Sequence, residues 1–333
     1  MRTCMRLLCR VTLAGLIGLV VAGIAHAENT ADAAALKARF ETMGEQLRSS
    51  PFGRPVVLES AERPDALVGD IYAVLEHPFA RVSAALDDAP AWCDVLMLHL
   101  NVKRCTVAGR GATSTVAIRL GRKHDQSVTD AYRLEFAYGV PASTSDYLQV
   151  QMSAASGPLG TRDYRIAFDA MPLPDGRSFV HLTYSYGYGL AARVAMLGYL
   201  STLGRSKVGF SNAPGASAEA PRPVAGVRGL IERNTMRYYL AIAAYLDAAS
   251  LPEPQRLERR LHDWFEATER YPRQLHEMDE AAYLEMKRAE LKDNPRAPAA
   301  LPPEGALSPV GAARRGLKPC GPRLSLLLCS ACR

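Results

Sequence analysis

The feature of this sequence that most restricts its fold is a series of segments, between residues 67 and 188, in which apolar side chains recur at every second position. A period of two is typical of β-strands, because successive side chains point to opposite faces of a sheet. The residues expected to share one face are Ile71, Ala73 and Leu75; those near Leu100 to Val107; Val116, Ile118 and Leu120; Tyr132, Leu134, Phe136 and Tyr138; Leu148, Val150 and Met152; Tyr164, Ile166 and Phe168; and Leu182, Tyr184, Tyr186 and Tyr188. Seven strands with short connections predict an antiparallel meander with one covered face.

Helical periodicity is found before these strands, between the first and second of them, and after the last. The predicted helices are an N-terminal helix at 28–50, two short helices at Phe79–Leu86 and Trp92–Leu98, an apolar helix at Leu190–Leu203, a long helix at 227–249, and a charged helical stretch at 255–293 that Pro272 interrupts. The apolar helix is too short and too interrupted for a membrane span, so we expect it to be buried. The prediction is an α+β protein in which a seven-stranded antiparallel sheet wraps around a long C-terminal helix, with extra N- and C-terminal helices.

The formal net charge of +6 does not indicate a nucleic-acid partner, because the excess lies at the two ends of the chain. Of the 40 basic residues, three lie in 1–27 and six lie beyond Pro295, whereas only one of the 34 acidic residues lies in those two segments. Positions 28–295 therefore carry 31 basic and 33 acidic residues. We expect no nucleic acid among the partners.

The first 27 residues are typical of a cleaved secretory signal peptide. Arginines precede an apolar run, Val11–Ala25, and Ala25-His-Ala27 has the small residues of a cleavage site. A run of this length is short of the roughly 20 residues that span a bilayer, so a retained anchor is the weaker interpretation. The prediction is a periplasmic protein with no transmembrane segment after cleavage.

Export permits disulfides, and only two of the five cysteines after position 27 lie in the part that is expected to fold. They are Cys93 and Cys105, and a bridge would join a short helix to a strand. Two buried thiols are the alternative, and the spacing does not match a zinc site. The segment 296–333 is rich in Pro, Ala, Gly and Arg and has no periodicity, so we expect a disordered tail.

The order of predicted elements resembles the helix-grip fold of the START-like superfamily, which includes lipid-transfer domains, polyketide cyclases and plant ligand receptors. The segment that carries the resemblance is Gly69–Asp87, which looks like the opening strand, Pro-containing turn and first helix of that family. The resemblance covers about residues 55–250 and implies a cavity between the sheet and the long helix. The segment 251–295 would then be a charged helical extension, and it departs from the family pattern, as does the helix at 190–203.

If the resemblance holds, side chains of the correct parity face the cavity and bind a ligand. The candidates are Phe136, Tyr138, Tyr184, Tyr186 and Tyr188 on strands, and Arg233, Arg237 and Tyr238 on the long helix. Tyrosine rings offer apolar area together with a hydroxyl that fixes a polar group. Alternating tyrosines also pack solid cores, and that alternative stays open.

Arg233 and Arg237 lie one helical turn apart, where like charges repel unless an anion lies between them. That anion could be an acidic group of the ligand, or it could be a carboxylate of Asp70, Asp94 or the extension.

No motif for catalysis, nucleotides or metal is present: the seven histidines are scattered, and neither G-x-S-x-G nor a phosphate-binding glycine loop occurs. We therefore expect no metal and no cofactor. The hypothesis is an exported binding protein for a hydrophobic or amphipathic small molecule, lipid-like or aromatic. The alternatives are a cyclase- or hydrolase-like enzyme that uses His99, Asp94 and the tyrosine cluster as acid and base groups in the same cavity, and an envelope assembly protein that binds a partner through 255–293.

Overall fold

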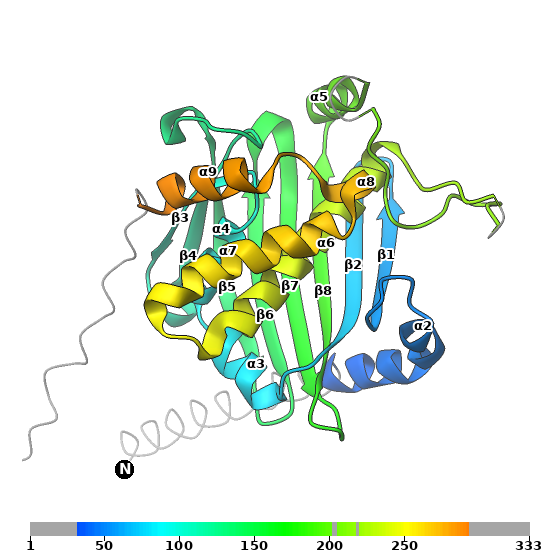
Figure 1. Ribbon diagram of the computed structural model, residues 1–333, viewed down its shortest axis with the longest axis vertical. Helices are drawn as coiled ribbons and strands as arrows, with labels where there is room; N and C mark the ends of the chain where they lie inside the picture. Colours follow the sequence, from blue (N-terminus) through cyan, green and yellow to red (C-terminus); the bar gives the residue numbers. More distant parts are fainter. Residues whose placement is uncertain (1–31, 202–204, 218–219, 293–333) are drawn as a thin grey trace, which may run out of the picture. The chain divides into compact units, whose positions relative to one another are not determined.

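The computed structural model describes residues 32–201, 205–217 and 220–292, which all belong to one compact unit. Its main element is a single antiparallel sheet with the strand order β1-β2-β8-β7-β6-β5-β4-β3 (Figure 1). The strands are β1 (Val56–Glu62), β2 (Ala66–Leu75), β3 (Val102–Ala108), β4 (Thr115–Leu120), β5 (Tyr132–Ser143), β6 (Leu148–Ser156), β7 (Thr161–Pro172) and β8 (Ser178–Tyr188). The α+β class with a large antiparallel sheet is confirmed, but the predicted number of seven strands is wrong, because the sheet has eight.

The strand missing from the prediction is β1, which forms one edge of the sheet. It pairs only with β2, from Val56 opposite Ala73 to Glu62 opposite Leu67. Most of its residues are half-buried or exposed, so its sequence lacks the alternation of apolar and polar residues that marks the other strands. An edge strand can be this polar because one of its sides has no neighbouring strand.

Helices cover both faces of the sheet. They are a helix at 32–42, α2 (Gly44–Arg48), α3 (Phe79–Leu86), α4 (Ala89–Met97), α5 (Leu190–Ser201), α6 (Gly226–Asp247), α7 (Glu253–Glu269), α8 (Pro272–Leu275) and α9 (Glu280–Lys292), with 3-10 turns η1 (Gly111–Thr113), η2 (Val128–Asp130), η3 (Pro158–Gly160) and η4 (Ala248–Ser250). The predicted N-terminal helix is interrupted at Met43. The predicted interruption at Pro272 is present, because a new helix begins there.

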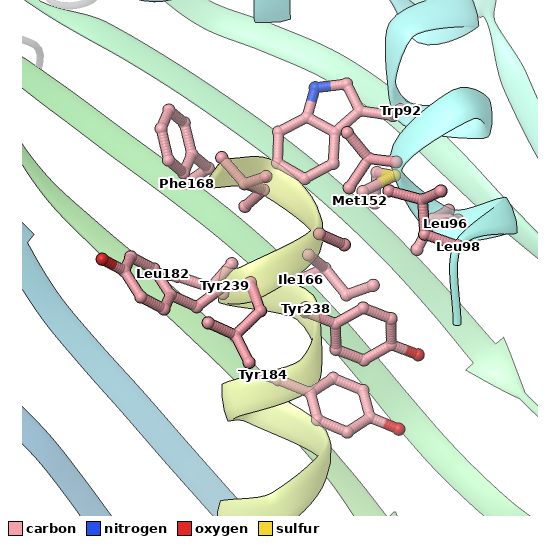
Figure 2. Packing of buried hydrophobic residues seen from close by; sticks show 14 of the residues in the cluster. Trp92, Leu96, Leu98, Met152, Ile166, Phe168, Leu182, Tyr184, Tyr238 and Tyr239 are labelled. Atoms are coloured by element: carbon pink, nitrogen blue, oxygen red, sulfur yellow. The ribbon is translucent and has the colours of Figure 1, made fainter. Parts of the chain in front are cut away.

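The long helix α6 packs on β1, β2, β8 and α4 (Figure 1). Gly69 of β2 permits the close approach, because a Cβ at that position would overlap Thr235 Oγ1 of α6. The main apolar core fills the space between the sheet and α3, α4 and α6 (Figure 2). Within it, the Trp92 ring packs edge-on against Phe168 with centroids 5.7 Å apart, and its indole nitrogen donates to Leu86 O at 2.8 Å.

A second apolar cluster lies on the opposite face of the sheet. Its sheet residues include Tyr72 and Val74, whose neighbours Ile71 and Ala73 belong to the main core. The helix at 32–42 and α2 cover this cluster with Leu36, Phe40, Met43 and Leu47.

The C-terminal helices α7 and α9 are part of the main core. Trp264 of α7 and Tyr283 of α9 are wholly buried and stack with centroids 5.0 Å apart. Trp264 donates to Arg237 O of α6 at 3.1 Å, and Arg260 of α7 pairs with Asp94 of α4 at 2.9 Å. Most of the large apolar residues of this stretch therefore face their own domain, whereas Leu257 is exposed.

The predicted disulfide is confirmed: Cys93 of α4 and Cys105 of β3 are bonded, with Cα atoms 5.4 Å apart. Within the described ranges, no helix has the length and apolar character needed to span a membrane. The predicted signal peptide at 1–27 and the predicted tail at 296–333 lie outside the described residues.

Candidate functional site

A pocket of about 350 Å³ lies between the sheet and α6. Its apolar walls come from β4 and β5, with Ile118, Leu134 and Phe136, and its remaining sides come from β7, β8, η3 and α5. The volume is at the lower end of the roughly 300–1,000 Å³ that is usual for small-molecule sites. The space fits one chain or one to two rings.

Four tyrosines form an aromatic wall in this pocket: Tyr164, Tyr184, Tyr186 and Tyr238. Ring centroids lie 5.3 Å apart for Tyr164 and Tyr186, and 5.1 Å apart for Tyr184 and Tyr238. The Tyr164 hydroxyl donates to Thr161 at 2.9 Å, and the Tyr186 hydroxyl donates to Met196 Sδ at 3.6 Å.

The hydroxyls of Tyr184 and Tyr238 are different from the other two. Figure 2 shows the two hydroxyls pointing the same way, and both residues line the pocket. No described residue forms a hydrogen bond with either hydroxyl. Burial raises the pKa of both phenols, so both keep their protons and act as donors.

His99 lies at one end of the pocket, in the loop between α4 and β3. Its Nδ1 accepts the Asn101 backbone N–H at 3.1 Å, which assigns the ring proton to Nε2. Burial, and then the charges of Arg237, Lys123 and Lys287, hold the pKa of this imidazole well below its usual value. The Asn234 side chain lies nearby, but within the described residues no hydrogen bond of good geometry reaches Nε2. His99 is therefore a neutral donor.

Lys123, from the β4–β5 loop, lines the same end of the pocket. Burial and then Arg237 lower its pKa to about 8, against the opposing effect of Glu277. Glu277 Oε1 accepts from Lys123 at 2.5 Å and from Arg237 at 2.8 Å. Although burial opposes it, these two cations hold the pKa of Glu277 below its usual value. Lys207 completes the group and donates to His276 O.

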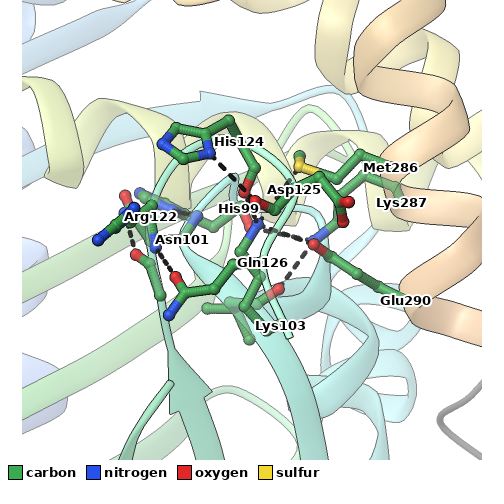
Figure 3. A network of polar contacts seen from close by, with 12 residues as sticks. His99, Asn101, Lys103, Arg122, His124, Asp125, Gln126, Met286, Lys287 and Glu290 are labelled. Carbon is green, nitrogen blue, oxygen red and sulfur yellow. Dashed lines mark hydrogen bonds and ion pairs between the residues drawn. The ribbon is translucent and has the colours of Figure 1, made fainter. Parts of the chain in front are cut away.

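The polar network next to His99 joins α9 to β3 (Figure 3). Glu290 accepts from Lys103 at 2.8 Å and from Lys287 at 2.6 Å, and both lysine side chains are wholly buried. Lys287 also donates to His99 O at 3.2 Å and to Val102 O at 2.8 Å. The chain that carries His99 is thus held by the C-terminal helix.

Four of the eight residues proposed from the sequence line the pocket: Phe136, Tyr184, Tyr186 and Tyr238. Tyr138, on β5, is buried away from the pocket, and its hydroxyl has no hydrogen-bond partner among the described residues. The Tyr188 hydroxyl donates to Arg63 O at 3.2 Å, and Tyr188 does not line the pocket.

Arg233 and Arg237 are wholly buried and lie behind the pocket wall. Arg233 donates to Val208 O at 3.2 Å, and the anion at Arg237 is Glu277, from the segment after α8. Asp94, considered with His99 as an acid–base pair, binds Arg260 at 2.9 Å and does not line the pocket.

Sequence reasoning did not propose Lys123 or Tyr164 as site residues. Tyr164 lies on the same predicted strand face as Ile166 and Phe168, so the alternation of side chains along that strand could have identified it. Lys123 lies in a loop, and only the folded chain brings it to Glu277, 154 residues later.

The helix α5 borders the pocket with Ala192, Ala195 and Met196, but the expectation that this helix is buried is wrong. Leu190, Val194 and Leu197 are 78%, 62% and 51% exposed and lie on one stripe of the helix. Only the pocket side of α5 contacts the body of the protein, through η3, β8 and α6.

No family model matches the chain, and no curated protein matches its sequence. Among solved structures, a protein from Thermus thermophilus has 15% identity and a TM-score of 0.36, over 55% of this chain and 98% of that chain. Norcoclaurine synthase from Thalictrum flavum has 10% identity and a TM-score of 0.30, over 44% and 77%. The Zhui aromatase/cyclase from a Streptomyces species has 11% identity and a TM-score of 0.29, over 62% and 95%. Likenesses at this level carry no argument about function.

Proposed function

We propose that this chain is an exported START-like protein that binds one hydrophobic or amphipathic small molecule, lipid-like or aromatic, in the pocket between the sheet and α6. The observation that carries the proposal is the pocket itself. Its walls are mostly apolar and aromatic, and the hydroxyls of Tyr184 and Tyr238 have no hydrogen-bond partner among the described residues. An apolar cavity with a few convergent polar groups is the usual form of a small-molecule site.

Binding without catalysis is the form of the proposal that the geometry supports best. An acid–base mechanism would need a second side chain beside His99, so that one group accepts a proton from the substrate and the other donates one. The carboxylate considered for this role, Asp94, pairs with Arg260, and no described residue that lines the pocket carries a carboxylate. Burial raises the pKa of Tyr184 and Tyr238, the tyrosines of the cluster that lie near His99, so their phenols are poor acids at neutral pH.

Export is part of the proposal and is supported by the disulfide between Cys93 and Cys105, because such bonds persist in oxidising compartments. A role in binding an envelope partner through 255–293 has less support. The large apolar residues Leu261, Trp264 and Tyr283 of that stretch are buried against the rest of the domain.

The test is native mass spectrometry with organic extraction, on residues 28–295 purified from the periplasm of an expressing cell. Ala192→Phe places a larger side chain in the pocket, because Ala192 is buried and lines it. Ala191→Phe is the matched control, because Ala191 is the preceding residue of α5, is exposed and does not line the pocket. We expect a bound mass in the wild type and in Ala191→Phe, and its loss in Ala192→Phe with the fold retained by circular dichroism. A folded wild-type protein that is empty and takes up no uncharged hydrophobic dye would refute the proposal.

A further inference from the structure

The polar groups at one end of the pocket are hydrogen-bond donors. The phenols of Tyr184 and Tyr238 keep their protons, and the Nε2 of His99 carries a hydrogen. Asn234 accepts from Arg237 through Oδ1 at 3.4 Å, which leaves its amide hydrogens for a ligand. No Asp or Glu is present among the described lining residues, so a ligand that donates finds few acceptors.

The charge at this end of the pocket is positive. Among the described lining residues, Lys123 is the only one that is mainly cationic at neutral pH, because its pKa is about 8. Behind it, one oxygen of Glu277 serves both Lys123 and Arg237, and Lys207 and Arg233 add further positive charge to the same region. A second carboxylate placed at Lys123 would gain charge-assisted hydrogen bonds in a site of low dielectric constant.

We propose that the ligand is an amphipathic carboxylic acid, with its carboxylate at Lys123, Asn234 and His99 and its apolar part against the tyrosine wall and α5. This inference rests on the proposed function and adds the chemical class of the ligand. The pocket volume of about 350 Å³ favours a single acyl chain or a small ring system over a lipid with two chains.

The test compares four compounds that differ only at the head group: dodecanoic acid, its methyl ester, dodecanol and dodecylamine. Their dissociation constants are measured at pH 7.5 by displacement of an uncharged fluorescent dye and by calorimetry. We expect the acid to bind about tenfold more tightly than the ester, since hydrogen bonds to charged groups are stronger than those to neutral ones. The amine should bind most weakly, because it would place a second cation beside Lys123.

Lys123→Met should weaken binding of the acid by about tenfold and change binding of the ester by less than about twofold. Lys37→Met is the matched control, because Lys37 is exposed on the N-terminal helix, which covers the other face of the sheet. The comparison of head groups in the wild type needs no variant, so it decides the matter even if Lys123→Met does not fold.

Each result has one meaning. If ester or amine binds as tightly as the acid, the inference is refuted and the proposed function stands. If none of the four compounds and no dye binds to the folded protein, the proposed function fails and the inference fails with it.

Discussion

Replacing Glu290 by Gln should cost about 3 kcal/mol of unfolding free energy at pH 7, because two buried ammonium groups depend on this one carboxylate. Glu290 accepts from Lys103 and Lys287, whose side chains are wholly buried between α9 and β3 (Figure 3). Glutamine keeps the size of the side chain and one acceptor oxygen. The substitution therefore removes charge with little change in packing.

The magnitude follows from the two lysines taken separately. Burial lowers the pKa of Lys287 to about 8, against the opposing effect of Glu290. Without Glu290 this amine releases its proton at pH 7, and the cost is limited to about 1.4 kcal/mol, the value of one pKa unit. Lys103 loses a charge-assisted hydrogen bond, which is worth about 1.5–3 kcal/mol.

The assay is urea unfolding of residues 28–295 at pH 7 and pH 9, followed by tryptophan fluorescence. Glu285→Gln is the control, because it makes the same change at an exposed position of α9. At pH 9 Lys287 is neutral in both proteins, so the penalty of Glu290→Gln should fall by about 1 kcal/mol. A penalty equal to that of Glu285→Gln, or one that does not change with pH, would refute the reasoning.

Three further predictions use the same unfolding assay. In the wild type, the free energy of unfolding should rise by about 2–3 kcal/mol from pH 7 to pH 9, because unfolded lysine holds its proton to about 10.4, whereas folded Lys123 and Lys287 release theirs near 8; a flat profile contradicts this. Gly69→Ala should cost about 1–3 kcal/mol, because the methyl group overlaps Thr235, and a neutral effect would mean that α6 moves freely. Cys93→Ser should cost about 2–4 kcal/mol under oxidising conditions and nothing once the wild type is reduced.

The alternation of apolar and polar residues was sufficient to predict the strands that have one buried face and one more exposed face. The period of two in β8 predicted correctly that Tyr184 and Tyr186 share one face, and both line the pocket. It failed for β1, because an edge strand with few buried residues shows no contrast between faces. It also failed for α5, where apolar composition predicted burial but Leu190 remains exposed.

Long-range charge pairing was beyond any local pattern. The spacing of Arg233 and Arg237 indicated a missing anion, and the sequence left open whether a ligand or the protein supplies it. The structure places Glu277 at Arg237, 40 residues away, after a helix break. Such a pairing depends on how α7 and α8 turn back across α6, which neither spacing nor composition determines.

The disulfide has a consequence for how ligand binding is measured. Cys93 and Cys105 are 12 residues apart in the sequence, and the covalent ring that they close contains His99 and Asn101, which line the pocket, and the buried Lys103. Thiol reagents would open this ring and leave the His99 loop held by noncovalent contacts, among them the packing of Leu98 and Leu100 in the core and the hydrogen bond from Lys287. Under the proposed function, affinity for the ligand then becomes dependent on redox state, and protein made in a reducing cytosol is expected to bind more weakly than the same chain folded in an oxidising compartment.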